Sequence, residues 1–78
     1  PLTAWAGEFP GKGSREKWEE AKKYNSLGLR QAKEENYTEA KASFQKAIDT
    51  YDQDPSFYHN VALVCELRKQ SSEAEQYY

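Results

Sequence analysis

Residues 24–47 read YNSLGLRQAKEENYTEAKASFQKA, and this stretch holds two apolar patterns on either side of the polar residues 34–36. Upstream, apolar or small side chains recur three or four residues apart, which is the spacing of one helix face: Trp18, Ala21, Tyr24, Leu27 and Gly28. Downstream the same spacing returns: Ala40, Phe44, Ala47, Ile48 and Tyr51. The pattern predicts two helices, one beginning at Arg15 and ending near residue 33, the other beginning near Thr38 and ending before residues 52–54.

Helix-start signals extend this prediction in both directions. Ser14 has the side chain of an N-cap, and Glu16 follows where a carboxylate meets the positive end of the helix dipole. Asp54 and Pro55 read as an N-cap followed by proline at the first helical position, and we expect a third helix to about Lys69.

The apolar residues of this third helix cover more than one face, which predicts burial on two sides: Tyr58, Val61, Ala62, Val64, Cys65 and Leu67. A strand is the competing interpretation for residues 61–65, but the run is bounded by helix-forming residues rather than by turn residues. Ser72 and Glu75 form a capping box, which predicts that a short fourth helix opens at Ser72.

Residues 1–13 differ from the rest of the chain, because they hold two of the three prolines and three of the four glycines. Such a composition favours turns and extended structure. Trp5 and Phe9 nevertheless place two large rings in this segment, and rings are costly to expose to water. The segment reads either as an arm that docks its rings or as a linker or cloning remnant.

The chain resembles itself when it is shifted by 34 residues. The matches place Tyr24 on Tyr58, Leu27 on Val61, Gly28 on Ala62, Ala40 on Ala74, and Phe44 on Tyr78. The four small residues would let neighbouring helices approach closely, and the rings would fill the spaces between them.

On these residues the chain resembles the tetratricopeptide repeat family, whose pattern is an aromatic, then L-G, then A-x3-F, then Pro, over 34 residues. Here it reads Tyr24-x2-Leu27-Gly28, then Ala40-x3-Phe44, then Pro55. The resemblance covers residues 21–78, about 1.7 repeats. Three positions depart from the pattern: Gln31, Lys41 and Ser71. A generic antiparallel helical hairpin is the alternative.

The resemblance implies an all-α fold of antiparallel helical hairpins, a fragment of a solenoid or superhelix. It divides the chain into an arm or linker (1–13), a first hairpin with a helix extension (14–54) and a second, incomplete hairpin (55–78). The residues that it assigns to repeat packing are Tyr24, Leu27, Gly28, Ala40, Phe44, Ala47, Tyr58, Val61, Ala62, Ala74 and Tyr78. Cys65 falls on a core-facing position and is expected to be buried.

The resemblance also implies a peptide-binding groove lined by the first helix of each hairpin. The positions that carry over are Lys22, Asn25, Leu29, Lys33, His59, Asn60, Leu63 and Glu66. The first four step by three, four and four, so they share one helix face independently of any family. That face suits backbone hydrogen bonds together with a carboxylate. The alternatives are that Lys22 and Lys33 are solubilising charges, and that Leu29 and Leu63 pack on another repeat or another molecule.

Composition and motifs exclude several classes of function. One cysteine and one histidine cannot build a typical structural zinc site, and no catalytic set, phosphate loop or cofactor motif is visible, so we expect no enzyme, metal or cofactor. The most apolar run, residues 61–67, is far below the ~20 residues of a membrane span. Residues 1–33 carry a net charge of +3 and residues 34–78 one of −5, without the basic stripe that binds nucleic acid.

Two hypotheses for function follow. The first is a protein-interaction scaffold, part of a longer array, that binds a peptide or protein segment in its groove. Recognition of a chaperone's terminal carboxylate is disfavoured, since Asn25 and Leu29 replace the Lys and Asn of that signature. The second is self-association as a homodimer through an uncovered surface at Val64, Leu67 and Tyr78, by repeat stacking, helix exchange or arm docking. A regulatory arm of an enzyme outside these residues is a third alternative.

Overall fold

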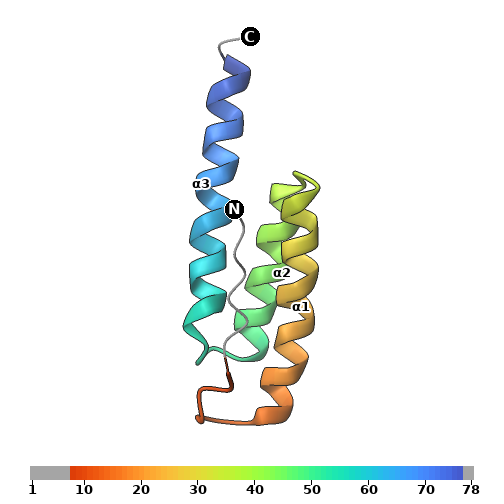
Figure 1. Cartoon of the computed structure of the whole chain (residues 1–78), viewed down its shortest axis with the longest axis vertical. Helices are drawn as coiled ribbons and strands as arrows, with labels where there is room; N and C mark the ends of the chain where they lie inside the picture. The colour runs from red at the N-terminus through yellow and green to blue at the C-terminus, as the bar shows by residue number, and fades with distance from the viewer. Residues whose placement is uncertain (1–7, 77–78) are drawn as a thin grey trace.

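The computed structural model describes the backbone of residues 8–76 and the side chains of residues 8–70. Three helices make up this part of the chain: α1 (Arg15–Lys33), α2 (Tyr37–Thr50) and α3 (Pro55–Gln76). The described residues contain no strand, which confirms the prediction of an all-α fold. α1 and α2 form a hairpin, α3 packs on α2, and the C-terminal half of α3 projects beyond the hairpin (Figure 1).

The boundaries of α1 are those that the sequence predicts. The Ser14 hydroxyl accepts a hydrogen bond from the Lys17 backbone N–H at 3.2 Å, which satisfies one of the free donors at the start of the helix. At the other end the chain turns within three residues, and Glu35 takes a positive φ of 64° there. α2 begins at Tyr37, one residue before the predicted start.

The third helix is longer than the sequence predicts. The Asp54 carboxylate accepts hydrogen bonds from the Ser56 backbone N–H at 2.9 Å and from the Ser56 hydroxyl at 2.7 Å, as an N-cap does. The helix then continues through residues 61–65 without a strand, and through Ser72 to Gln76. The prediction of a separate fourth helix is therefore wrong. Residues 69–72 contain no glycine or proline, so nothing in the sequence ends α3 there.

The core consists of two apolar clusters. One gathers at the end of the hairpin where α1 starts: Trp18, Ala21, Ala47, Tyr51 and Phe57, with Phe9, Tyr24 and Ile48 partly buried against them. The other lies toward the turn between α1 and α2: Ala32, Ala40, Phe44 and Val64, with Leu29, Tyr37 and Val61 partly buried against them. Each cluster draws on all three helices, so burial of these side chains joins α3 to the hairpin.

Close approach at Gly28 is confirmed. A Cβ at this position would lie 2.6 Å from Cε1 of Phe44, so only glycine fits beneath the ring. Ala40 and Ala47, which the sequence also assigns to packing, are fully buried in α2. Tyr24 and Leu27 are half-buried in α1.

The packing predictions for α3 are largely wrong. Tyr58 is 48% exposed, and Ala62 and Cys65 are exposed as well, whereas Val61 is half-buried. The three exposed residues share the face of α3 that points away from the hairpin, so among the described side chains residues 55–70 of α3 are buried on one side only. Ala74 and Tyr78 lie outside the described side chains.

Candidate functional site

The predicted groove face of α1 borders a shallow hollow. A cavity of about 330 Å³ is lined by Glu19, Lys22, Lys23, Asn25, Ser26 and Leu29. Three of the four predicted α1 residues thus meet at one surface. Lys33 is exposed in the last turn of α1 and does not line the hollow.

Lys22 is the most constrained cation of this surface. Its Nζ lies 3.2 Å from Oε2 of Glu19 and 3.9 Å from the centroid of the Trp18 ring. A cation over the face of tryptophan is attracted by the ring quadrupole, and the carboxylate holds it from the other side. Lys22 therefore has two neighbours that favour this position of its ammonium, which lies beside the hollow while the side chain stays partly exposed.

Asn25 and Asn60 take a different position from the one predicted. Nδ2 of Asn60 donates a hydrogen bond of 2.8 Å to Oδ1 of Asn25, and the two residues are 1% and 2% exposed. The amides therefore join α3 to α1 instead of both facing a ligand. The predicted positions place both residues on the flanks of their helices, but α3 lies close enough to α1 for the two flanks to meet.

Oδ1 of Asn60 makes no hydrogen bond within the described residues. A buried amide oxygen without a partner is costly. The burial of Asn60 and its hydrogen bond to Asn25 make it a structural contact in this fold, while Asn25 also lines the hollow.

The other predicted α3 residues lie apart from the hollow. His59 and Glu66 are exposed, and Leu63 is half-buried. They step by four and three residues, so they share a face of α3 that adjoins Asn60 and hence the contact with α1. The candidate site is thus the α1 hollow, flanked by this face.

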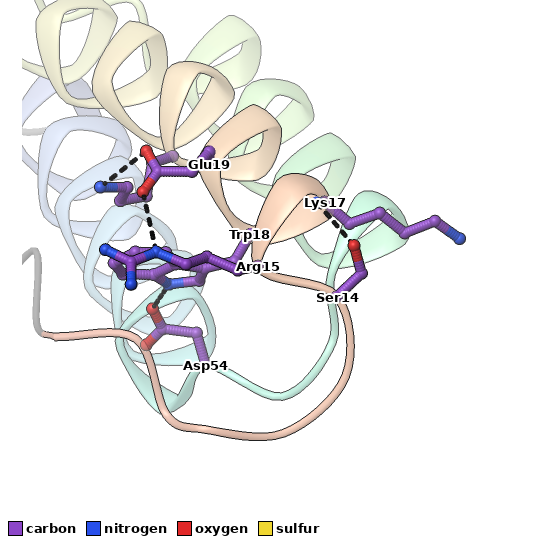
Figure 2. Close-up of polar contacts among 7 residues, drawn as sticks. Ser14, Arg15, Lys17, Trp18, Glu19 and Asp54 are labelled. Atoms are coloured by element: carbon purple, nitrogen blue, oxygen red, sulfur yellow. Dashed lines mark hydrogen bonds and ion pairs between the residues drawn. The ribbon is translucent and has the colours of Figure 1, made fainter.

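A buried polar contact that the sequence does not predict joins α1 to the residue that precedes α3. Nε1 of Trp18 donates a hydrogen bond of 2.9 Å to Oδ2 of Asp54, and both residues are buried. Figure 2 shows the indole of Trp18 above the Asp54 carboxylate, joined to it by a dashed line, with Glu19 higher on the same helix. The sequence indicated only that Trp18 lies on the apolar face of a helix and that Asp54 is an N-cap. No rule based on neighbouring residues predicts a hydrogen bond between residues 36 positions apart.

A second hollow, of about 480 Å³, lies near the start of α1 and contains none of the predicted site residues. Lysines and aspartates both contribute to it, so it has no single sign of charge. Its lining residues are Lys12, Gly13, Ser14, Lys17, Asp49, Thr50, Tyr51, Asp52 and Gln53.

Searches for a metal centre and a membrane span give negative findings for the described part of the chain. Among the side chains of residues 8–70, no three His, Cys, Asp or Glu residues gather as metal ligands would. No helix within residues 8–76 has the length and hydrophobicity of a membrane span.

Comparison with known proteins does not identify a relative. No protein-family model, no curated protein and no solved structure matches this chain. The candidate site therefore depends on the geometry given above.

Proposed function

We propose that this chain is a protein-interaction scaffold of the tetratricopeptide repeat type, which binds a peptide or protein segment over the α1 hollow. The observation that carries the proposal is the hollow itself, because Lys22 and Leu29 of the predicted groove face line it, together with Asn25, which is buried in its hydrogen bond with Asn60. The hairpin of α1 and α2, with Gly28 against Phe44, supports the repeat architecture.

The chemistry of the hollow favours a ligand with an acidic group beside an aliphatic side chain. Lys22 and Lys23 supply two positive charges to the lining against the one negative charge of Glu19, while half-buried Leu29 supplies apolar surface. A carboxylate that accepts a hydrogen bond from a positioned ammonium gains more than one bound by a mobile side chain, because less conformational entropy is lost. Lys22 has that positioning through Trp18 and Glu19.

The test is charge reversal on α1, with ligands selected from a displayed library of random peptides and then measured as free peptides. The variant Lys22→Glu with Lys33→Glu should weaken binding of the selected peptide by at least about tenfold, the loss of one charge-assisted hydrogen bond. Since Lys33 does not line the hollow, Lys22→Glu alone should account for most of that effect.

The matched control is Lys17→Glu with Lys69→Glu, which changes net charge equally at two exposed lysines outside the hollow. Circular dichroism should show unchanged helicity in both variants. Equal affinity in wild type and the α1 variant would remove the hollow from the proposal.

Self-association is a second candidate, and the exposed face of α3 favours it. Tyr58, Ala62 and Cys65 step by four and three residues and leave an apolar stripe in solvent. This stripe replaces the predicted surface at Val64, Leu67 and Tyr78, because Val64 is buried in the core, Leu67 is half-buried and Tyr78 lies outside the described residues. Sedimentation across a concentration series tests the candidate, and Ala62→Lys should shift any dimer to monomer.

A further inference from the structure

The segment that precedes α1 is packed against the helices. Residues 8–13, called the strap below, carry Phe9 into contact with the core: its ring centroid lies 5.4 Å from that of Trp18 and 6.2 Å from that of Tyr51. The guanidinium of Arg15 also lies over the Phe9 ring, 5.9 Å from its centroid. The tilted arrangements of Phe9 with Trp18 and with Tyr51 are ones that aromatic pairs favour.

The backbone of the strap also meets the core. The hydroxyl of Tyr51 donates a hydrogen bond to the carbonyl oxygen of Lys12. Gly13 has a φ of +73°, which L side chains rarely adopt, and a Cβ there would touch Cε1 of Tyr51 at 3.4 Å. The chain can therefore turn from Phe9 into α1 while its backbone stays close to the Tyr51 ring.

Trp18 is one of two core aromatic residues that the strap contacts, the other being Tyr51. The Trp18 ring contacts Phe9 and also lies under Nζ of Lys22, the constrained cation of the hollow. Its Nε1 donates to Asp54, whose other oxygen caps the first turn of α3. One indole is thus shared by the strap, the candidate site and the start of α3.

We propose that the strap is a clamp: docking of Phe9 fixes the Trp18 indole, and through it the first turn of α3 and the position of Lys22. Release of the strap removes a neighbour from one part of the indole, so the Trp18–Asp54 hydrogen bond opens more often. It also frees the surface on which Lys22 rests, which lowers the affinity of the hollow for its ligand. The statement about affinity rests on the proposed function, whereas the statement about Trp18 does not.

The test uses the full chain with Trp5→Phe, so that Trp18 is its single tryptophan, and compares Phe9→Ala with Phe9 retained. Hydrogen exchange of the Trp18 indole N–H, followed by NMR, should accelerate about threefold to tenfold in Phe9→Ala, the range expected when an aromatic pair is lost. Glu8→Ala, at the exposed neighbouring position, is the matched control and should leave the exchange rate unchanged. An indole exchange rate unchanged in Phe9→Ala, with helicity retained, would overturn the clamp.

If Phe9→Ala loses its helical circular dichroism, Tyr51→Phe decides instead, because it removes only the hydroxyl that holds Lys12. Tyr51→Phe should also accelerate hydrogen exchange of the Trp18 indole N–H, and an unchanged exchange rate would equally reject the proposal.

A separate measurement addresses the hollow. With a peptide that binds wild type, Phe9→Ala should weaken binding severalfold although Phe9 does not line the hollow, and unchanged affinity would overturn the link to Lys22. Absence of any binding peptide would count against the proposed function alone, since indole exchange still tests the clamp.

Discussion

Gly28→Ala gives a sharp test of the hairpin, because two ordinary effects oppose each other at this position. In the interior of an exposed helix, replacing glycine by alanine stabilises by about 1 kcal/mol. At Gly28 the added Cβ would lie 2.6, 2.7 and 3.0 Å from Cε1, Cδ1 and Cζ of Phe44, all shorter than an ordinary van der Waals contact. Phe44 is 1% exposed, so its ring has little space into which it can move.

Overpacking of a core typically costs about 1–3 kcal/mol, and three short contacts to one immobile ring place this case at the upper end. The net expectation is a loss of about 2 kcal/mol in the free energy of unfolding, and a fall in Tm of about 10 °C for a domain of this size. Urea unfolding followed by circular dichroism measures the free energy, and an unchanged m-value would show that the unfolded state is not altered.

Ser26→Ala, at an exposed position two residues earlier in α1, is the matched control and should stabilise by a few tenths of a kcal/mol. Phe44→Leu in the Gly28→Ala background should recover part of the loss, because the smaller side chain vacates the contact. A Gly28→Ala variant as stable as wild type or more so would refute the close approach of α1 and α2.

Two further predictions concern Asp54 and Tyr51, which lie between α2 and α3. Asp54→Ala should lower stability by about 3 kcal/mol, since it leaves the buried Nε1 of Trp18 without an acceptor and removes the cap of α3, and thermal unfolding beside the exposed control Asp52→Ala measures it. Burial raises the pKa of the Tyr51 phenol above 10.0, and the carboxylates of Asp54 and Asp52 add to that shift. Because the folded state favours the neutral phenol, its contribution to stability is complete below the unfolded pKa of 10.0 and is lost as pH rises through the folded value. Urea midpoints across alkaline pH should therefore fall more steeply in wild type than in Tyr51→Phe, and parallel curves would contradict this assignment.

Local rules account for the parts of the fold that the sequence predicted. Ser14 and Asp54 mark helix starts because a side-chain oxygen next to free backbone donors is a contact between near neighbours. The α1 hollow could be anticipated for the same reason, since residues on one helix face remain together whatever the helix packs against. The close approach of α1 to Phe44 at Gly28 is a contact between residues farther apart in the sequence. It could be predicted because a small residue within an apolar stripe indicates close approach.

The predictions that were wrong or left open concern contacts between distant residues, which the spacing of neighbouring residues does not determine. The continuation of α3 past Lys69 and the exposure of Ala62 are not set by neighbouring residues in the sequence, and the 34-residue match placed a partner helix there that the described residues do not supply. The docking of Phe9 was only one of two interpretations of the first residues, because composition cannot distinguish a docked segment from a linker.

Two buried hydrogen bonds explain why the relation of α1 to α3 escaped prediction and why it matters for binding. Trp18 to Asp54 and Asn60 to Asn25 both cross from α1 to the α3 segment, and each joins side chains at least 35 positions apart. Apolar burial is non-directional and tolerates small sliding of one helix along another, whereas a buried hydrogen bond fixes a distance and an angle. The helices can therefore form from local patterns alone, while the shape of the α1 and α3 surface depends on these polar pairs. A substitution at either pair is expected to alter the candidate site before it alters helicity.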